Sequence, residues 1–123
     1  MYTVLIADDE HNIRHILDFS LHAEGFDVVV AHDGEQALSM AQEQSPDLII
    51  LDVMMPGQGG IETCRALKND PATAAIPVIL LTARATKADR TAGTEAGADD
   101  YITKPFSPQK VIETVQGLLG VAH

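Results

Sequence analysis

Two uninterrupted aliphatic runs constrain the fold of this chain more than any other feature. They are Leu48–Leu51 and Val78–Leu81. A strand that is apolar on both of its faces must be covered on both sides, which is typical of parallel sheets in α/β proteins. The chain is therefore expected to form a parallel sheet that lies between two layers of helices.

Short apolar runs alternate with longer amphipathic stretches along the whole sequence. This strand–helix alternation predicts an α/β fold with right-handed crossovers between parallel strands. The expected strands are Thr3–Ala7, Asp27–Ala31, Leu48–Leu51, Val78–Leu81 and Tyr101–Thr103. The expected helices are His11–Glu24, Gly34–Gln44, Gly60–Asn69, Lys87–Ala96 and Pro108–Leu119.

Local signals mark the ends of several of these helices. Gly25 is a natural stop for the first helix, and Ser107 is placed to cap the last one. The helix expected at Lys87–Ala96 has the weakest pattern, because it is rich in Thr and Ala and contains Gly93 in its middle.

Length and composition limit the classes of protein to consider. The 123 residues fit one domain, residues 1–123, and a hydrophobic content of 46% is enough for a packed core. The net charge of −10 argues against direct binding to nucleic acid or to an anionic membrane. The single Cys64 excludes an internal disulfide, and the start lacks the pattern of a signal peptide, so a cytoplasmic location is expected.

Polar side chains follow the strands at the points where the strands end. Asp8 and Asp9, and then Glu10, follow the first strand, Asp52 the third, Thr82 the fourth and Lys104 the fifth. In an open parallel sheet the ligand site lies beyond the carboxyl ends of the strands. These side chains are therefore expected to meet at one rim of the sheet.

The chemistry of this set points to phosphoryl transfer. Three aspartates at one rim repel one another unless a cation lies among them, and carboxylate oxygens suit Mg²⁺. An aspartate is able to act as a nucleophile and to form an aspartyl phosphate. The Lys104 ammonium and the Thr82 hydroxyl suit the oxygens of a phosphoryl group. The sequence therefore predicts a Mg²⁺-dependent site in which Asp52, Thr82 and Lys104 are the catalytic residues.

The sequence resembles the receiver domain of bacterial two-component response regulators, and in particular the chemotaxis regulators. The resemblance covers essentially the whole chain, and the combination of its motifs is highly specific although each motif alone is weak. The motifs are Asp8–Asp9, Leu51–Gly57, Thr82–Ala83 and Gly97–Phe106. The resemblance implies a flavodoxin-like, doubly wound fold with five helices and a five-stranded parallel sheet in the order 2-1-3-4-5.

The resemblance also implies roles for individual residues at the acidic rim. Asp52 would be the phospho-acceptor. Asp9 and Asp52 would bind Mg²⁺ directly together with the main-chain carbonyl of Met54, and Asp8 would act largely through water.

Further roles follow for the neighbouring strands. Lys104 would pair with the phosphoryl group, and its peptide bond to Pro105 would be cis. Thr82 would turn toward the phosphoryl group, and Tyr101 would swing inward into the vacated space. This coupling of a local charge change to a second element is what a switch requires.

The partners implied are a sensor histidine kinase or a histidine phosphotransfer protein, and an unidentified downstream protein or effector domain. The protein would then be a phospho-accepting switch and not an enzyme, with only self-catalysed phosphoryl transfer and autodephosphorylation. The last helix carries Lys110 as its only cation. A monomer or a weak dimer is expected, since receivers that dimerise through this region often place arginines there.

Three alternatives have weaker support. A phosphatase acting through an aspartyl phosphate typically has a second acid two residues after its nucleophile, where this chain has Met54. A flavin binder needs a phosphate-binding loop after the first strand, where Asp8, Asp9 and Glu10 would repel the flavin phosphate. A degenerate receiver that serves only for docking would not need the complete set of site residues.

Overall fold

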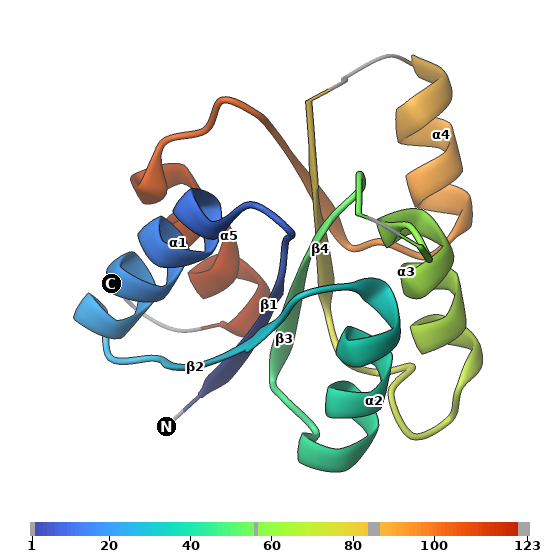
Figure 1. Ribbon diagram of the computed structural model, residues 1–123, viewed down its shortest axis with the longest axis horizontal. Coiled ribbons are helices and arrows are strands. Elements are labelled where there is room, and N and C mark those ends of the chain that lie inside the picture. The colour runs from blue at the N-terminus through green and yellow to red at the C-terminus, as the bar shows by residue number, and fades with distance from the viewer. Residues whose placement is uncertain (1, 56, 84–86, 121–123) are drawn as a thin grey trace.

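A five-stranded parallel sheet runs through the middle of the molecule (Figure 1). The computed structural model describes residues 2–55, 57–83 and 87–120. The sheet has the order β2-β1-β3-β4-β5, and every pair of neighbouring strands is parallel. This confirms the expected flavodoxin-like topology. The strands are β1 (Thr3–Ala7), β2 (Asp27–Ala31), β3 (Leu48–Asp52), β4 (Val78–Thr82) and β5 (Asp100–Thr103).

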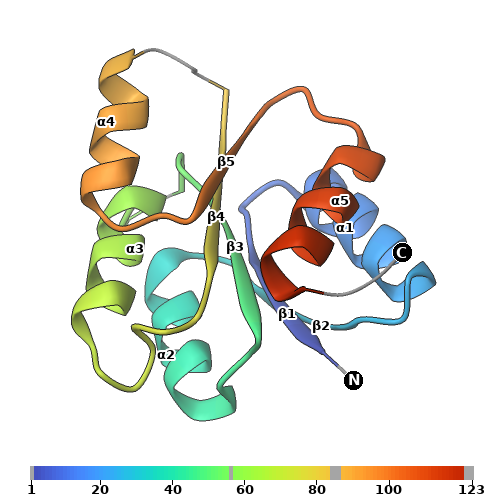
Figure 2. The same cartoon turned by 180° about the vertical axis from the view of Figure 1, so that it is seen from behind.

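Helices cover both faces of the sheet. Helices α1 and α5 lie together on one face, and α2, α3 and α4 lie on the other, as the two opposite views show (Figures 1 and 2). Of the helices in the described ranges, none is long and apolar enough to span a membrane. The helices are α1 (His11–Ala23), α2 (Gly34–Gln44), α3 (Gly60–Asn69), α4 (Lys87–Glu95) and α5 (Pro108–Leu119).

The apolar residues of β3 explain why the sheet needs two helical layers. Leu48 and Ile50 pack into the core on the side of α1 and α5, whereas Ile49 and Leu51 pack into the core on the opposite side. All four side chains are fully buried. Because successive side chains of a strand point to opposite faces, each face of β3 contributes to a separate hydrophobic layer.

The helix ends follow the local signals in the sequence. The Oγ of Ser107 accepts a hydrogen bond of 3.1 Å from the Lys110 amide at the start of α5, as a helix cap does. Helix α1 ends at Ala23, and Gly25 then adopts a φ of +91°, a conformation that favours glycine.

The predicted bounds differ from the observed ones by one residue at several ends. Strand pairing continues through Asp52, which lies opposite Leu81, and through Thr82, which lies opposite Thr103. These two residues are therefore the last residues of β3 and β4 and do not belong to the following loops. Helices α1 and α4 end one residue earlier than expected, and β5 begins one residue earlier, at Asp100.

Candidate functional site

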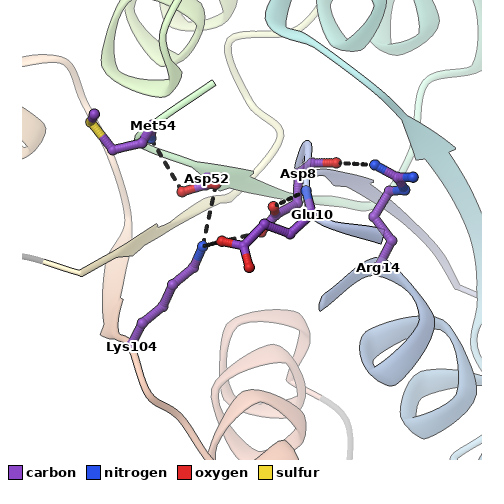
Figure 3. A network of polar contacts seen from close by, with 6 residues as sticks. All are labelled: Asp8, Glu10, Arg14, Asp52, Met54 and Lys104. Atoms are coloured by element: carbon purple, nitrogen blue, oxygen red, sulfur yellow. Dashed lines mark hydrogen bonds and ion pairs between the residues drawn. The ribbon is translucent and has the colours of Figure 1, made fainter. Parts of the chain in front are cut away.

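The carboxyl ends of β1, β3 and β5 bring three charged side chains together (Figure 3). Asp8 directly follows β1 and is fully buried, and Asp52 at the end of β3 is only 2% exposed. Lys104 follows β5, and its side chain reaches back over the rim toward both carboxylates (Figure 3). The convergence expected from the strand ends is thus present for these residues.

A single ammonium group contacts several carboxylates at this rim. The Nζ of Lys104 lies 3.3 Å from Oδ2 of Asp52, 3.4 Å from Oδ2 of Asp8 and 3.5 Å from Oε1 of Glu10. The side chain of Lys104 is 15% exposed, so water screens these contacts only partly. One positive charge does not balance the carboxylates around it, and the cluster keeps a net negative charge.

Carboxylate oxygens of Asp8, Glu10 and Asp52 all lie within 4.8 Å of one another. Mg²⁺ takes hard oxygen donors from a protein and needs only a few of them, because it keeps several of its waters. The residual negative charge beside Lys104 also favours a divalent cation. The donor set and its charge therefore fit Mg²⁺.

The pKa of Asp52 is raised to about 6. Burial is the largest cause, and the charge of Asp8 adds to it. The Met54 amide, which donates a hydrogen bond of 3.2 Å to Oδ1, and the ammonium of Lys104 both lower the pKa and oppose this shift. Above a pH of about 6 the group is mainly the carboxylate, the form that acts as a nucleophile.

The pKa of Lys104 is shifted upward despite its burial. Burial lowers the pKa of an ammonium group, but the charges of Asp52, Asp8 and Glu10, together with the hydrogen bond to Asp52, raise it by more. Lys104 therefore stays positively charged at neutral pH. A fixed cation at this place is suited to the oxygens of an anionic group bound beside Asp52.

Main-chain contacts hold the acidic turn after β1 in place. Oδ1 of Asp8 accepts a hydrogen bond of 2.9 Å from the Glu10 amide, and the Asp8 carbonyl accepts one of 2.7 Å from the Arg14 guanidinium (Figure 3). Both contacts tie the end of β1 to the first turn of α1. The buried carboxylate of Asp8 is thereby fixed toward Asp52 and not toward solvent.

The start of α3 lies close against the end of β3. The Gly60 amide donates a hydrogen bond of 3.1 Å to the Val53 carbonyl. A methyl group on Gly60 would lie 2.8 Å from the carbonyl carbon of Asp52 and 2.9 Å from Cα of Val53. Gly60 therefore permits the close approach that fixes the backbone at Asp52, a role that its sequence position at a helix start did not reveal.

The remaining predicted site residues lie around this cluster. Asp9 is exposed, and the side chain of Met54 is 72% exposed while its amide faces Asp52. Thr82 is buried at the end of β4, and Tyr101 is half-buried in β5, opposite Leu80.

The peptide bond between Lys104 and Pro105 is cis, as expected. Glu10 was expected at this rim after the acidic pair, but not among the metal ligands. The structure places its carboxylate in the cluster with Asp8 and Asp52.

Comparisons with known proteins agree with this geometry. Residues 4–116 match the sequence profile described as the response regulator receiver domain. The alkaline phosphatase synthesis transcriptional regulatory protein PhoP of Bacillus subtilis is 45% identical over 116 residues, which are 94% of this chain and 48% of that protein. The chain thus spans about half the length of this curated relative.

Solved structures give the same result for the fold. The chemotaxis protein CheY4 of Vibrio cholerae has a TM-score of 0.92 and 34% identity, with 97% of this chain and 99% of that chain covered. The Francisella response regulator 1452 receiver domain has a TM-score of 0.91 and 34% identity, with 98% of each chain covered. On its sequence and its fold, this chain belongs to the response regulator receiver domain family, the signalling switches of two-component systems.

Proposed function

We propose that the protein accepts a phosphoryl group on Asp52 from a phosphohistidine of a partner protein. The observation that carries this proposal is the position of the Asp52 carboxylate, which is buried at the end of β3 and lies 3.3 Å from the Lys104 ammonium. A nucleophile and a cation at this distance provide both parts that an aspartyl phosphate needs from the protein.

In the reaction, a carboxylate oxygen of Asp52 attacks the phosphorus atom. The new O–P bond forms as the P–N bond to the donor imidazole breaks, and the imidazole nitrogen keeps the electron pair and takes a proton from solvent. The ammonium of Lys104 offsets the negative charge on the phosphoryl oxygens. Attack of water on the phosphorus later releases inorganic phosphate and restores the carboxylate.

Mg²⁺ would be held directly by Asp9, Asp52 and the main-chain carbonyl of Met54, and by Asp8 largely through water. Bound Mg²⁺ supplies positive charge that offsets the charge on the transferred phosphoryl group. Glu10 is an alternative metal ligand to Asp9. The carboxylate of Glu10 lies in the cluster with Asp8 and Asp52, whereas Asp9 is exposed. Titration of Mg²⁺ into Asp9→Asn and Glu10→Gln distinguishes the two assignments, since only loss of a true ligand weakens binding strongly.

The conformational change would spread from Asp52 to Thr82 and Tyr101 on the neighbouring strands. Thr82 ends the strand next to Asp52 and would turn its hydroxyl toward the phosphoryl group. Tyr101 lies one strand further, opposite Leu80, and would move into the space that Thr82 leaves. A charge change at Asp52 is thereby converted into a change at the surface of β5.

The partners follow from this reaction. The phosphoryl donor is a sensor histidine kinase or a histidine phosphotransfer protein. The phosphorylated protein then acts on a downstream protein or effector domain. Residues 1–123 would act as one receiver domain in the cytoplasm, as a monomer or weak dimer. Sedimentation at several concentrations, with and without beryllofluoride, tests the oligomeric state. A tight dimer that forms only with the mimic would overturn the proposed monomer or weak dimer.

Intact mass spectrometry tests the central step. The protein is incubated with Mg²⁺ and acetyl phosphate beside Asp52→Asn. One added phosphoryl group that hydroxylamine removes, and that the variant lacks, is the expected result. An adduct of equal yield in Asp52→Asn would contradict the assignment. If neither protein gains mass, beryllofluoride binding separates rapid hydrolysis from loss of the chemistry, because a protein without the chemistry does not respond to the mimic.

A further inference from the structure

The helix glycine Gly93 lies directly against the ring of Tyr101. Gly93 is buried in α4, and a methyl group at this position would lie 2.7 Å from Cζ and 2.9 Å from Cε2 of Tyr101. The Tyr101 hydroxyl would be closer still to that methyl group. Atoms do not pack at such distances, so with any larger residue at position 93 either the ring or α4 must shift.

The backbone at Gly93 does not explain why glycine is found there. Gly93 does not have the positive φ that distinguishes Gly97, which has a φ of +95° just after α4. In a helix interior glycine is disfavoured relative to alanine. The space taken by Tyr101, and not the helix geometry, is therefore what requires glycine.

The ring of Tyr101 has room to leave this position. Tyr101 lines a cavity of about 450 Å³ together with Arg90, Phe106 and Lys110. The ring is only half-buried where it lies, although it packs against the buried core on that face of the sheet. A push from α4 is therefore expected to move the ring toward this cavity and toward solvent.

We propose that Gly93 is a positioning residue for Tyr101. Its missing side chain provides the space for the hydroxyl end of the ring, so that α4 sets where the ring lies. A change in the position of the Tyr101 ring would then change its packing on α4, and a shift of α4 would change the positions open to the ring. A role of this coupling in signalling rests on the switch role proposed above for Tyr101.

A double-mutant cycle tests the contact itself. The midpoint of urea unfolding is measured for Gly93→Ala in the wild-type background and in a Tyr101→Ala background. Without the ring, Gly93→Ala is expected to raise the midpoint, as an unhindered helix substitution does. With the ring present, the midpoint is expected to stay unchanged or to fall. Equal shifts in both backgrounds would overturn the proposal.

Gly117 in α5 provides the matched control, because a methyl group there meets nothing within 4 Å. Gly117→Ala should raise the midpoint equally in both backgrounds. If Gly93→Ala alone does not fold, recovery of folding by Tyr101→Ala supports the proposal, and failure to recover overturns it.

The ring position is measured directly by fluorine NMR. The chain contains two tyrosines and no tryptophan, so fluorotyrosine labelling of a Tyr2→Phe protein gives one signal, from Tyr101. Gly93→Ala is expected to shift this signal and to increase its response to solvent, whereas Gly117→Ala leaves it in place. An unchanged signal in Gly93→Ala would overturn the proposal.

Addition of Mg²⁺ and beryllofluoride separates this inference from the proposed function. The wild-type signal should then move, and it should move less in Gly93→Ala. A wild-type signal that does not move would overturn the switch role of Tyr101. The positioning role of Gly93 would still be supported by the shift in the untreated protein.

Discussion

The Nζ of Lys104 lies 3.3 Å from Oδ2 of Asp52, and the same ammonium lies 3.4 Å from Oδ2 of Asp8. Two buried carboxylates therefore share one cation, with the Glu10 carboxylate as a further, more exposed neighbour. Burial raises the free energy of a carboxylate unless its charge is fully offset. In the absence of a divalent cation, this uncompensated charge is expected to destabilise the fold.

Neutralising Asp52 should therefore stabilise the metal-free protein. We expect Asp52→Asn to raise the free energy of unfolding by about 1–3 kcal/mol at pH 7.5, since a pKa raised from 3.8 to about 6, a shift that already includes the contact with Lys104, corresponds to a penalty of this order. Urea unfolding in EDTA measures the difference. Asp27→Asn is the control, because Asp27 is exposed at the opposite end of the sheet. An unchanged or lower stability of Asp52→Asn would contradict a crowded acidic site.

This stabilisation should depend on pH in a defined direction. A carboxyl group whose pKa is raised from 3.8 to about 6 binds its proton more tightly in the folded state. Its contribution to stability is therefore complete below pH 3.8 and is lost as the pH rises through about 6. The difference in stability between Asp52→Asn and wild type should be small near pH 4 and reach a plateau above pH 7. Urea unfolding in EDTA at several pH values measures this difference in the free energy of unfolding. A difference that grows toward low pH would refute the raised pKa of Asp52.

Much of the fold was predictable because the decisive signals are local. Leu48–Leu51 and Val78–Leu81 have the apolar pattern of strands that are buried on both faces, and Ser107 marks the start of a helix by its own hydrogen bond. The bounds were wrong by one residue at Asp52 and Thr82. Whether the ladder ends before or after these residues depends on their partners in neighbouring strands, which the local sequence does not contain.

The site was predictable in part for a similar reason. Asp8, Asp52 and Lys104 follow from topology, because the ends of parallel strands meet at one rim. Glu10 was expected at the rim but not as a candidate ligand, and the role of Gly93 was missed, since both depend on which way a side chain or a neighbouring ring points in three dimensions. In the sequence Gly93 only weakens a helix pattern, and its contact with Tyr101 exists only after α4 has packed beside β5.

Mg²⁺ should stabilise the wild-type protein more than the variant that lacks the acceptor carboxylate. A ligand that binds only the folded state raises its stability with increasing ligand concentration. We therefore expect the melting temperature of the wild-type protein to rise with added MgCl₂, and that of Asp52→Asn to rise much less. Additions of NaCl at equal ionic strength correct for screening of the exposed charges. Equal responses of the two proteins to MgCl₂ would argue against Asp52 as a ligand.

Lys104 should matter more for signalling than for folding. Lys104→Met keeps much of the apolar stem and removes the charge, leaving Asp8 and Asp52 without their shared cation. We expect a loss of about 1–3 kcal/mol in the free energy of unfolding in EDTA at pH 7.5. The loss should be smaller in an Asp52→Asn background, because one of the two buried carboxylates is then already neutral.

The signalling effect of Lys104→Met should be larger than this loss suggests. With Mg²⁺ and beryllofluoride, the fluorine signal of Tyr101 should no longer move, although circular dichroism shows a folded protein. Arg65→Met is the control, because Arg65 is exposed on α3 and does not line the cavity beside Tyr101, and the Tyr101 signal of this variant should move as in the wild type. A folded Lys104→Met protein with a full Tyr101 response would show that the ammonium is not needed for the switch. Loss of folding under all conditions would instead make Lys104 a structural residue, because its charge would then hold the ends of β1, β3 and β5 together.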